Sequence, residues 1–160
     1  KNIKNCSNYE ADLERALEEY ARLSKRGLLA CAEIPGVNEF LRRQKAKHVP
    51  CFVVSGGDEV EVNEVFAARK LTELFKRILG SPRNKNQNIE KLYEDGLLSG
   101  RGVFFGDAHS DLKAAAAYDL DFVFVSGTSD WVEGKEICSK NSCDCIADFT
   151  GLMDVEEIER

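Results

Sequence analysis

Apolar and polar residues along the chain follow two different periods. Over the first thirty residues the apolar side chains recur every three or four positions, which predicts an amphipathic helix. Its apolar face would carry Leu13, Leu17 and Tyr20. The stretch from Ser7 to Glu10 has the form of a capping box, and Lys25-Arg26-Gly27 supplies a basic last turn and a stop. Residues 1–30 are therefore predicted to form a packing helix, which we interpret as part of a cap over a site.

The next segment changes from helical spacing to a continuous apolar run. Pro35-Gly36 opens a second predicted helix, with apolar side chains on one face and a run of lysines and arginines on a solvated face. The run from Val49 to Val54 is almost entirely apolar and ends at Ser55-Gly56-Gly57. A short run of this kind predicts a strand that is buried on both faces, as in a parallel sheet.

Strands and helices alternate along the rest of the chain. Further strands are predicted at Phe75 to Leu79, from Val103, at Phe122 to Val125 and near Cys145 to Ala147. Helices are predicted after Asp58, through Ile89 to Tyr93 and from about Asp111 to Ala117. This alternation indicates a three-layer α/β fold, in which helices cover both faces of a parallel sheet through right-handed crossovers. We assign residues 31–150 to this core and residues 151–160 to an acidic C-terminal tail.

The composition suits one compact unit that binds small molecules. A chain of 160 residues with 43% hydrophobic residues can build one sizeable core. No apolar stretch approaches the roughly 20 residues of a membrane span, and the polar start from Lys1 to Asn5 lacks the apolar centre of a secretory signal. A net charge of −6 argues against non-specific nucleic-acid binding, because phosphate backbones attract an excess of Lys and Arg. We expect a cytoplasmic protein with small-molecule partners and neither a nucleic-acid nor a membrane partner.

The six cysteines admit two interpretations. A chain of this size can build a core without disulfides, and Cys51 falls inside a predicted strand, so reduced thiols are expected. Cys138, Cys143 and Cys145 could in principle hold zinc, but their spacing fits no common ligand pair and neither histidine is nearby in sequence.

Small polar residues follow the predicted strands, and ligands of parallel α/β folds bind at the carboxyl ends of strands. Ser55-Gly56-Gly57 places a hydroxyl and exposed backbone N–H groups at a helix N-terminus, which suits an oxyanion such as phosphate. Lys85 lies five residues beyond the strand end at Gly80, within reach of a phosphate. Taken singly, these residues are more typical of an ordinary glycine turn and a solvated surface lysine than of a phosphate site.

Asp107 and Asp111 lie four residues apart, between the end of one predicted strand and the first turn of a helix. Short carboxylates suit Mg²⁺, which keeps several waters and completes its shell with substrate phosphate. For Asp111 or Ser110 alone, capping of the following helix is the better explanation. His109 projects from the same loop and could touch a substrate, although an ordinary loop histidine explains it more simply.

The order of these groups resembles the haloacid dehalogenase (HAD) superfamily. Val53 to Asp58, Gly80 to Lys85 and Phe104 to Asp111 resemble its second, third and fourth motifs, within a match from about Gly27 to Gly127. The resemblance is closest to phosphoglycolate-phosphatase-like members and implies a Rossmann-like core.

The resemblance assigns a role to each candidate residue. Ser55, with Gly56, would bind the phosphoryl group, and Lys85 would neutralise it as a second catalytic residue. Asp107 would bind Mg²⁺ with Asp111 in support. The predicted activity is hydrolysis of a small phosphorylated metabolite through an aspartyl-phosphate.

The family's first motif, an apolar strand ending in Asp-x-Asp, has no counterpart ahead of Ser55, where Asp12 is the single aspartate. The missing strand would occupy the middle of the sheet, and its loss would leave backbone groups without partners at roughly 1–3 kcal/mol each. We therefore expect the native protein to carry this segment ahead of Lys1, or another chain to supply a strand, and we expect the chain without it to be inactive. A phosphomutase of the same superfamily and a non-catalytic phosphate-binding module remain alternatives, and a dehalogenase is disfavoured because it needs no metal pair. Substrate identity and oligomeric state stay open.

Overall fold

The computed structural model describes the backbone of residues 6–152 and the side chains of residues 9–152. Its helices are α1 (Cys6–Ala30), α2 (Val37–Ala46), α3 (Glu59–Ala68), the 3₁₀ turn η1 (Thr72–Leu74), α4 (Lys85–Glu94), α5 (His109–Ala117) and α6 (Gly134–Lys140). Its strands are β1 (Phe52–Asp58), β2 (Arg77–Ser81), β3 (Val103–Gly106), β4 (Asp121–Val125) and β5 (Asp144–Ile146). The acidic tail predicted at the C-terminus lies almost wholly outside the described residues.

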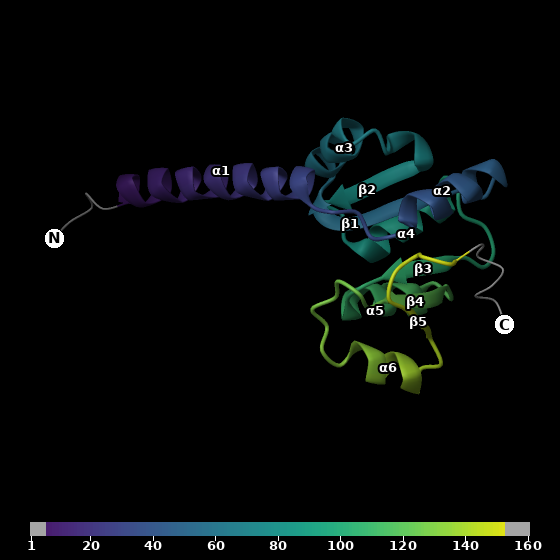
Figure 1. Ribbon diagram of the computed structural model, residues 1–160. Coiled ribbons are helices and arrows are strands. Elements are labelled where there is room, and N and C mark those ends of the chain that lie inside the picture. The colour runs from purple at the N-terminus through teal and green to yellow at the C-terminus, as the bar shows by residue number, and fades with distance from the viewer. Residues whose placement is uncertain (1–5, 153–160) are drawn as a thin grey trace.

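The first helix, α1, lies within the helical segment predicted at residues 1–30 and projects away from the rest of the protein (Figure 1). It has begun by Cys6, so the predicted start at Ser7 is wrong, and it continues past the predicted stop at Gly27 to Ala30. A tertiary contact explains the extension: the guanidinium of Arg69, the residue directly after α3, donates to the carbonyl oxygens of Leu28 at 3.0 Å and Cys31 at 2.9 Å. These bonds satisfy carbonyls that a helix end otherwise leaves without partners.

All strand pairs in the described residues are parallel, which confirms the predicted α/β fold. The strands form two groups: β1 pairs with β2, and β4 lies between β3 and β5. Within the described residues, one edge of β1 and one edge of β3 therefore have no strand partner. The predicted start of each strand lies within three residues of the observed start. Among the helices, α6 was not predicted.

The strand β4 shows why the core has three layers. Its residues from Phe122 to Val125 are all buried, and alternate side chains point to opposite faces. On one face, Val125 packs in a cluster with Phe40 of α2 and Phe149. On the other face, Phe122 and Phe124 pack with side chains of α5 and α6.

The strand β1 differs from its prediction. We expected it to start at Val49 and to be buried on both faces, but it starts at Phe52, Val49 is 40% exposed, and Phe52 to Ser55 are only half-buried. The reason is a cavity of about 1110 Å³ that is lined by both β1 and β3. The buried polar side chain of Gln44 lines the same cavity, and its Nε2 has no hydrogen-bond partner among the described residues.

The described cysteines are free thiols, as predicted. Burial, followed by the neighbouring sulfurs of Cys143 and Cys145, raises the pKa of Cys138 to about 11, so this thiol is protonated at neutral pH. Among the residues that the structure describes, no helix has the length and apolar character needed to cross a membrane.

Candidate active site

The end of β1 forms one wall of the site. The Ser55 Oγ accepts a hydrogen bond from the Gly57 N–H at 3.0 Å, which folds the glycine turn back on the serine. Asp58 caps α3 as predicted, with its Oδ1 accepting from the Glu61 N–H at 3.0 Å. Because the serine hydroxyl accepts this bond, its own O–H proton is left to donate to a ligand.

Lys85 is the first residue of α4, and the start of this helix is fixed by its neighbours. Asn84 and Gln87 form a reciprocal capping box, in which each side chain accepts from the other residue's backbone N–H. The Lys85 Nζ donates to the Asp111 Oδ1 at 2.5 Å and to the Ser110 Oγ at 3.2 Å. Two of the three ammonium protons are thus engaged, and the third can bind a ligand.

Asp111 lies buried at the centre of this arrangement, with 6% of its side chain exposed. Its Oδ2 accepts from the backbone N–H groups of Asp107 at 3.3 Å and Ala108 at 3.1 Å. The residue before them must be glycine, because a Cβ on Gly106 would lie 2.3 Å from the Asp111 Cβ. Asp111 therefore holds both Lys85 and the loop that carries Asp107.

Asp107 is exposed at the end of β3, and its carbonyl oxygen accepts from the Ser129 Oγ at 2.5 Å. Among the described residues, no group of three or more His, Cys, Asp or Glu side chains could hold a metal. Mg²⁺ is usually bound through only one or two protein carboxylates plus phosphate and water, so a single exposed Asp107 fits that chemistry. Asp111 fits less well as a direct ligand, since both of its oxygens are already engaged.

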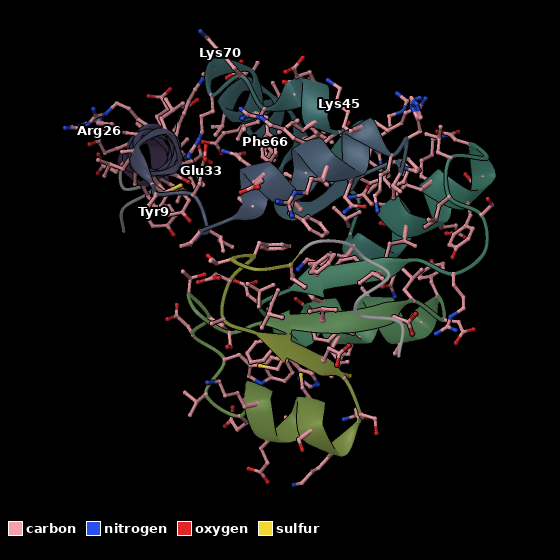
Figure 2. All side chains as sticks on the ribbon, turned by 45° about the vertical axis from the view of Figure 1, so that its right-hand side comes forward. Tyr9, Arg26, Glu33, Lys45, Phe66 and Lys70 are labelled. Carbon is pink, nitrogen blue, oxygen red and sulfur yellow. The ribbon has the colours of Figure 1, made fainter. Side chains whose placement is uncertain are left out.

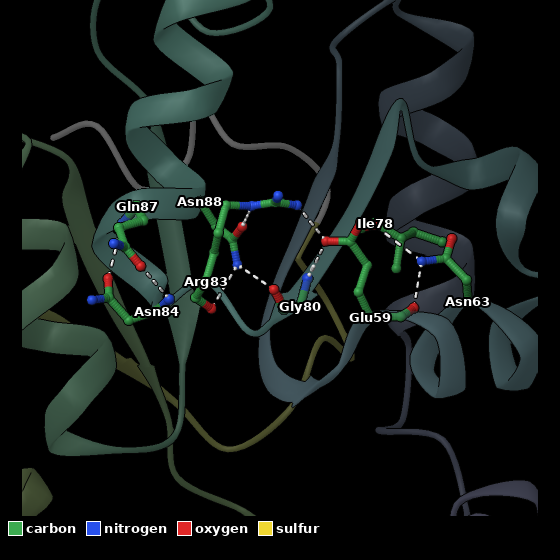
Figure 3. A network of polar contacts seen from close by, with 8 residues as sticks. All are labelled: Glu59, Asn63, Ile78, Gly80, Arg83, Asn84, Gln87 and Asn88. Atoms are coloured by element: carbon green, nitrogen blue, oxygen red, sulfur yellow. Dashed lines mark hydrogen bonds and ion pairs between the residues drawn. The ribbon is translucent and has the colours of Figure 1, made fainter.

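A polar network behind the site joins the first residue of α3, directly after β1, to the end of β2 and the loop that follows it (Figure 3). The Glu59 Oε2 accepts from the Gly80 N–H at 3.0 Å and from the Arg83 guanidinium at 2.7 Å. The fully buried Asn88 accepts from the Arg83 Nε at 2.8 Å and donates to the Gly80 carbonyl at 3.1 Å. The network helps to fix Ser55 and Lys85 relative to each other, because it ties the junction of β1 and α3 to the segment between β2 and α4.

Sequence reasoning missed this network. A signal was present for Asn88, which lies next to Ile89 and one turn before Leu92 on the buried side of α4. A polar side chain at such a position must find partners, since a buried amide without hydrogen bonds is costly. The partners, Arg83 and Gly80, lie outside α4, and no pattern within this helix predicts them.

Replacing Asn88 by alanine is expected to destabilise the fold by about 1–3 kcal/mol, because the Arg83 Nε and the Gly80 carbonyl each lose a buried partner. Urea unfolding followed by circular dichroism measures the change. Asn86→Ala on the exposed side of the same helix is the matched control and should change stability by less than about 0.5 kcal/mol. Equal effects of the two substitutions would show that the network carries no stability.

His109 is the first residue of α5 rather than a loop residue. Its ring is exposed and stacks on Trp131, with centroids 5.2 Å apart and planes 20° apart. The backbone N–H of Trp131 donates to the same Ser129 Oγ that donates to the Asp107 carbonyl. The aromatic pair therefore braces the loop of Asp107 from the side of α6.

The five residues singled out by sequence all line the same cavity between β1 and β3: Ser55, Gly56, Lys85, Asp107 and Asp111. Lys85 and Asp111 are in direct contact. Ser55 lies on β1 and Asp107 directly follows β3. Each of these two strands lines the cavity and has one edge without a strand partner among the described residues.

Comparison with known proteins identifies the class of this fold and site. The pattern of the haloacid dehalogenase-like hydrolase family matches residues 1–125. This match covers more than half of the chain, and the protein belongs to that family of hydrolases and phosphatases.

Solved structures share the fold at low sequence identity. A candidate phosphatase from Clostridium difficile aligns with a TM-score of 0.69 and 19% identity, over 91% of this chain and 68% of the other. A HAD-superfamily hydrolase from Ehrlichia chaffeensis aligns with a TM-score of 0.60 and 16% identity, over 94% of this chain and 77% of the other. A mutant of CbbY from Rhodobacter sphaeroides, in complex with xylulose-(1,5)bisphosphate, aligns with a TM-score of 0.57 and 17% identity, over 92% and 68%. No curated protein matches the sequence.

Proposed function

We propose that this protein is a Mg²⁺-dependent phosphomonoester hydrolase that acts on a small phosphorylated metabolite through an aspartyl-phosphate. The observation that carries the proposal is the convergence of Ser55, Lys85 and Asp107 on one cavity from three successive strand-to-helix connections. Phosphoryl transfer depends mainly on positioning and on neutralising charge, which a hydroxyl, an ammonium and a metal-binding carboxylate provide.

The free hydrogen-bonding capacity of each group supports its role. The Ser55 O–H and the neighbouring Gly56 N–H would donate to the phosphoryl oxygens, and the third proton of the Lys85 ammonium would do the same. Asp111 would act as a positioning residue, since its carboxylate holds the ammonium in place and braces the Asp107 loop.

Asp107 would hold Mg²⁺ through its exposed carboxylate, together with the substrate phosphate and water. The ion would supply charge neutralisation for the phosphoryl group and the attacking oxygen. The other groups act without a metal: they bind the phosphate, orient it and keep the loop in place.

The nucleophile would come from an extended segment that occupies the cavity between β1 and β3. Both edges that line the cavity lack a strand partner within the described residues, and the Gln44 Nε2 offers a donor there. Asp12 does not fit this role, because it lies on α1 with 71% of its side chain exposed. An apolar strand parallel to β1 and β3 would place residues at its carboxyl end beside Ser55 and Asp107.

Hydrolysis of p-nitrophenyl phosphate by the complete gene product tests the proposal. Turnover should require Mg²⁺, and Asp107→Ala should lower kcat by at least about 100-fold, because the metal loses its protein carboxylate. The control is Asp130→Ala, which removes an exposed carboxylate from the loop after β4 and should leave kcat within about twofold. Absence of turnover in the complete protein, or full activity of Asp107→Ala, would refute the assignment.

The same assay separates the alternatives. A phosphomutase would convert a sugar phosphate to its isomer without releasing stoichiometric phosphate, and a non-catalytic module would bind phosphate esters without turnover. The free thiols of the described cysteines support a reducing compartment such as the cytoplasm.

A further inference from the structure

The backbone of Asp107 is held at both of its polar groups, although its side chain is exposed. Its N–H donates to the buried Asp111 Oδ2 at 3.3 Å, and its carbonyl oxygen accepts from the Ser129 Oγ at 2.5 Å. The first bond lies within the connection from β3 to α5, whereas the second comes from the connection between β4 and α6. Ser129 therefore holds the Asp107 peptide from outside its own loop.

The orientation of the Ser129 hydroxyl is set by a local turn. Its Oγ accepts from the backbone N–H of Trp131, two residues further along, at 3.0 Å. A hydroxyl has one proton, and here that proton is donated to the Asp107 carbonyl. Ser129 thus links the backbone of Trp131 to the backbone of Asp107.

Trp131 is the fixed end of this link. Its ring packs edge-on against the fully buried Phe124 at 5.4 Å between centroids and stacks on His109 at 5.2 Å. Its carbonyl oxygen accepts from the Gly134 N–H at 3.0 Å, and a Cβ on Gly134 would lie 3.0 Å from the Trp131 Cε3. The start of α6 is therefore packed closely against Trp131, which anchors the link to the core.

The members of the link belong to the part of the molecule that contains β3, β4, α5 and α6. Figure 2 shows these elements on the side of the molecule away from α1. None of the contacts just described involves α1 or β1. The link therefore does not depend on the extended segment that we propose for the cavity.

The backbone of Asp107 matters because of the ion that its carboxylate would hold. Mg²⁺ demands near-ideal octahedral geometry at oxygen distances of about 2.0–2.1 Å, so a small displacement of a ligand weakens binding. The Asp107 side chain is exposed, and its position depends on the peptide that carries it. Changes to the groups that orient a metal ligand typically lower metal affinity by about 10–100-fold.

We infer that Ser129 is a positioning residue that sets the Mg²⁺ affinity of the site through the Asp107 backbone. The inference rests on the proposed function in one respect, which is the role of Asp107 as the metal ligand.

The same connection offers a matched control in Ser126. The Ser126 Oγ donates to the Ile146 carbonyl of β5 at 3.0 Å, which is the same kind of hydrogen bond to a neighbouring backbone. Its partner strand lies away from Asp107, on the other side of β4 from β3. Ser126→Ala therefore removes a comparable bond and leaves the link between Trp131 and Asp107 in place.

Titration of the complete gene product with Mn²⁺ tests the inference. Mn²⁺ accepts the same octahedral oxygen ligands as Mg²⁺, and its electron paramagnetic resonance signal measures the free ion without any substrate. Ser129→Ala should raise the Mn²⁺ dissociation constant by on the order of tenfold. Ser126→Ala should leave it within about twofold. The Mg²⁺ concentration for half-maximal hydrolysis of p-nitrophenyl phosphate should rise with Ser129→Ala by the same factor as the Mn²⁺ constant.

A second pair of variants keeps the test valid if Ser129→Ala fails to fold. Ser129→Thr and Ser129→Val have side chains of nearly equal size and differ in the hydroxyl. The threonine variant should bind Mn²⁺ within about threefold of the parent, and the valine variant should show the loss expected of alanine. Far-UV circular dichroism checks the fold of each variant.

The outcomes separate this inference from the proposed function. A parent that hydrolyses p-nitrophenyl phosphate, with unchanged Mn²⁺ affinity in Ser129→Ala, overturns the inference and leaves the function standing. The expected loss of affinity in a protein without turnover supports the inference and removes the function. Equal losses in Ser129→Ala and Ser126→Ala, or a parent that binds no Mn²⁺, also overturn the inference.

Discussion

Replacing Lys85 by methionine is expected to lower kcat on a phosphomonoester by at least about 100-fold and to destabilise the fold by about 3 kcal/mol. Both effects have one cause. The ammonium would donate to the phosphoryl group, and it is also the cationic partner of the Asp111 carboxylate, of which only 6% is exposed. Methionine fills a similar volume but leaves that carboxylate buried without its counter-charge. Urea unfolding measures the change in the free energy of unfolding, and p-nitrophenyl phosphate hydrolysis by the complete gene product measures kcat.

Two further variants separate the structural role of Lys85 from its chemical role. Lys91→Met removes a lysine from the same helix, where its partner is Asp95 in an exposed pair four residues away, and should cost less than about 0.5 kcal/mol. Adding Asp111→Asn to Lys85→Met removes the stranded charge, so stability should return towards the parent while activity stays low. Recovery of activity in this double variant would show that Lys85 acts only through the fold.

Replacing Gly106 by alanine is expected to cost about 3 kcal/mol of stability, because the new Cβ would overlap the buried side chain of Asp111. The two Cβ atoms would lie 2.3 Å apart, and the Asp111 Cγ would lie at 2.6 Å. Relief requires Asp111 to move, which breaks its bonds to Lys85 and to the backbone of Asp107. Thermal unfolding measures the loss.

Gly102→Ala is the matched control for this substitution. It lies just before the same strand, and its nearest atoms would be the ends of Leu120 and Leu98 at 3.4 and 3.5 Å, which is ordinary contact. We expect a change within about 1 kcal/mol, in either direction. Equal destabilisation at both positions would contradict the close packing of Asp111 against the strand end.

The order of elements could be read from the sequence because each depends on local physical chemistry. The apolar run of β4 and the turn residues after β3 predict strands whatever their tertiary surroundings. Asp58 caps α3 by accepting a hydrogen bond from the backbone N–H three residues further along. The candidate residues were found for the same reason: they follow strand ends, and strand ends in parallel sheets gather at one edge.

The errors share a different cause, which is long-range contact. The stop predicted at Gly27 of α1 was overridden by Arg69, which is 42 positions further along and bonds to the carbonyl of Cys31. The α6 helix is only seven residues long and buries little beyond Cys138, so it carries almost no periodic signal. The half-burial of β1 follows from the unpaired edge of β3 across the cavity, which is a property of neither strand alone.

By itself, the sequence determined the α/β alternation, the parallel strands and the identity of the polar residues at their ends, because backbone periodicity and turn chemistry act over a few residues. Only the tertiary structure decided that Lys85 is held by Asp111, that Glu59 and Asn88 both bind the end of β2, and that five candidate residues share one cavity. These facts depend on which side chains meet after folding, and that is settled by packing among elements far apart in the chain.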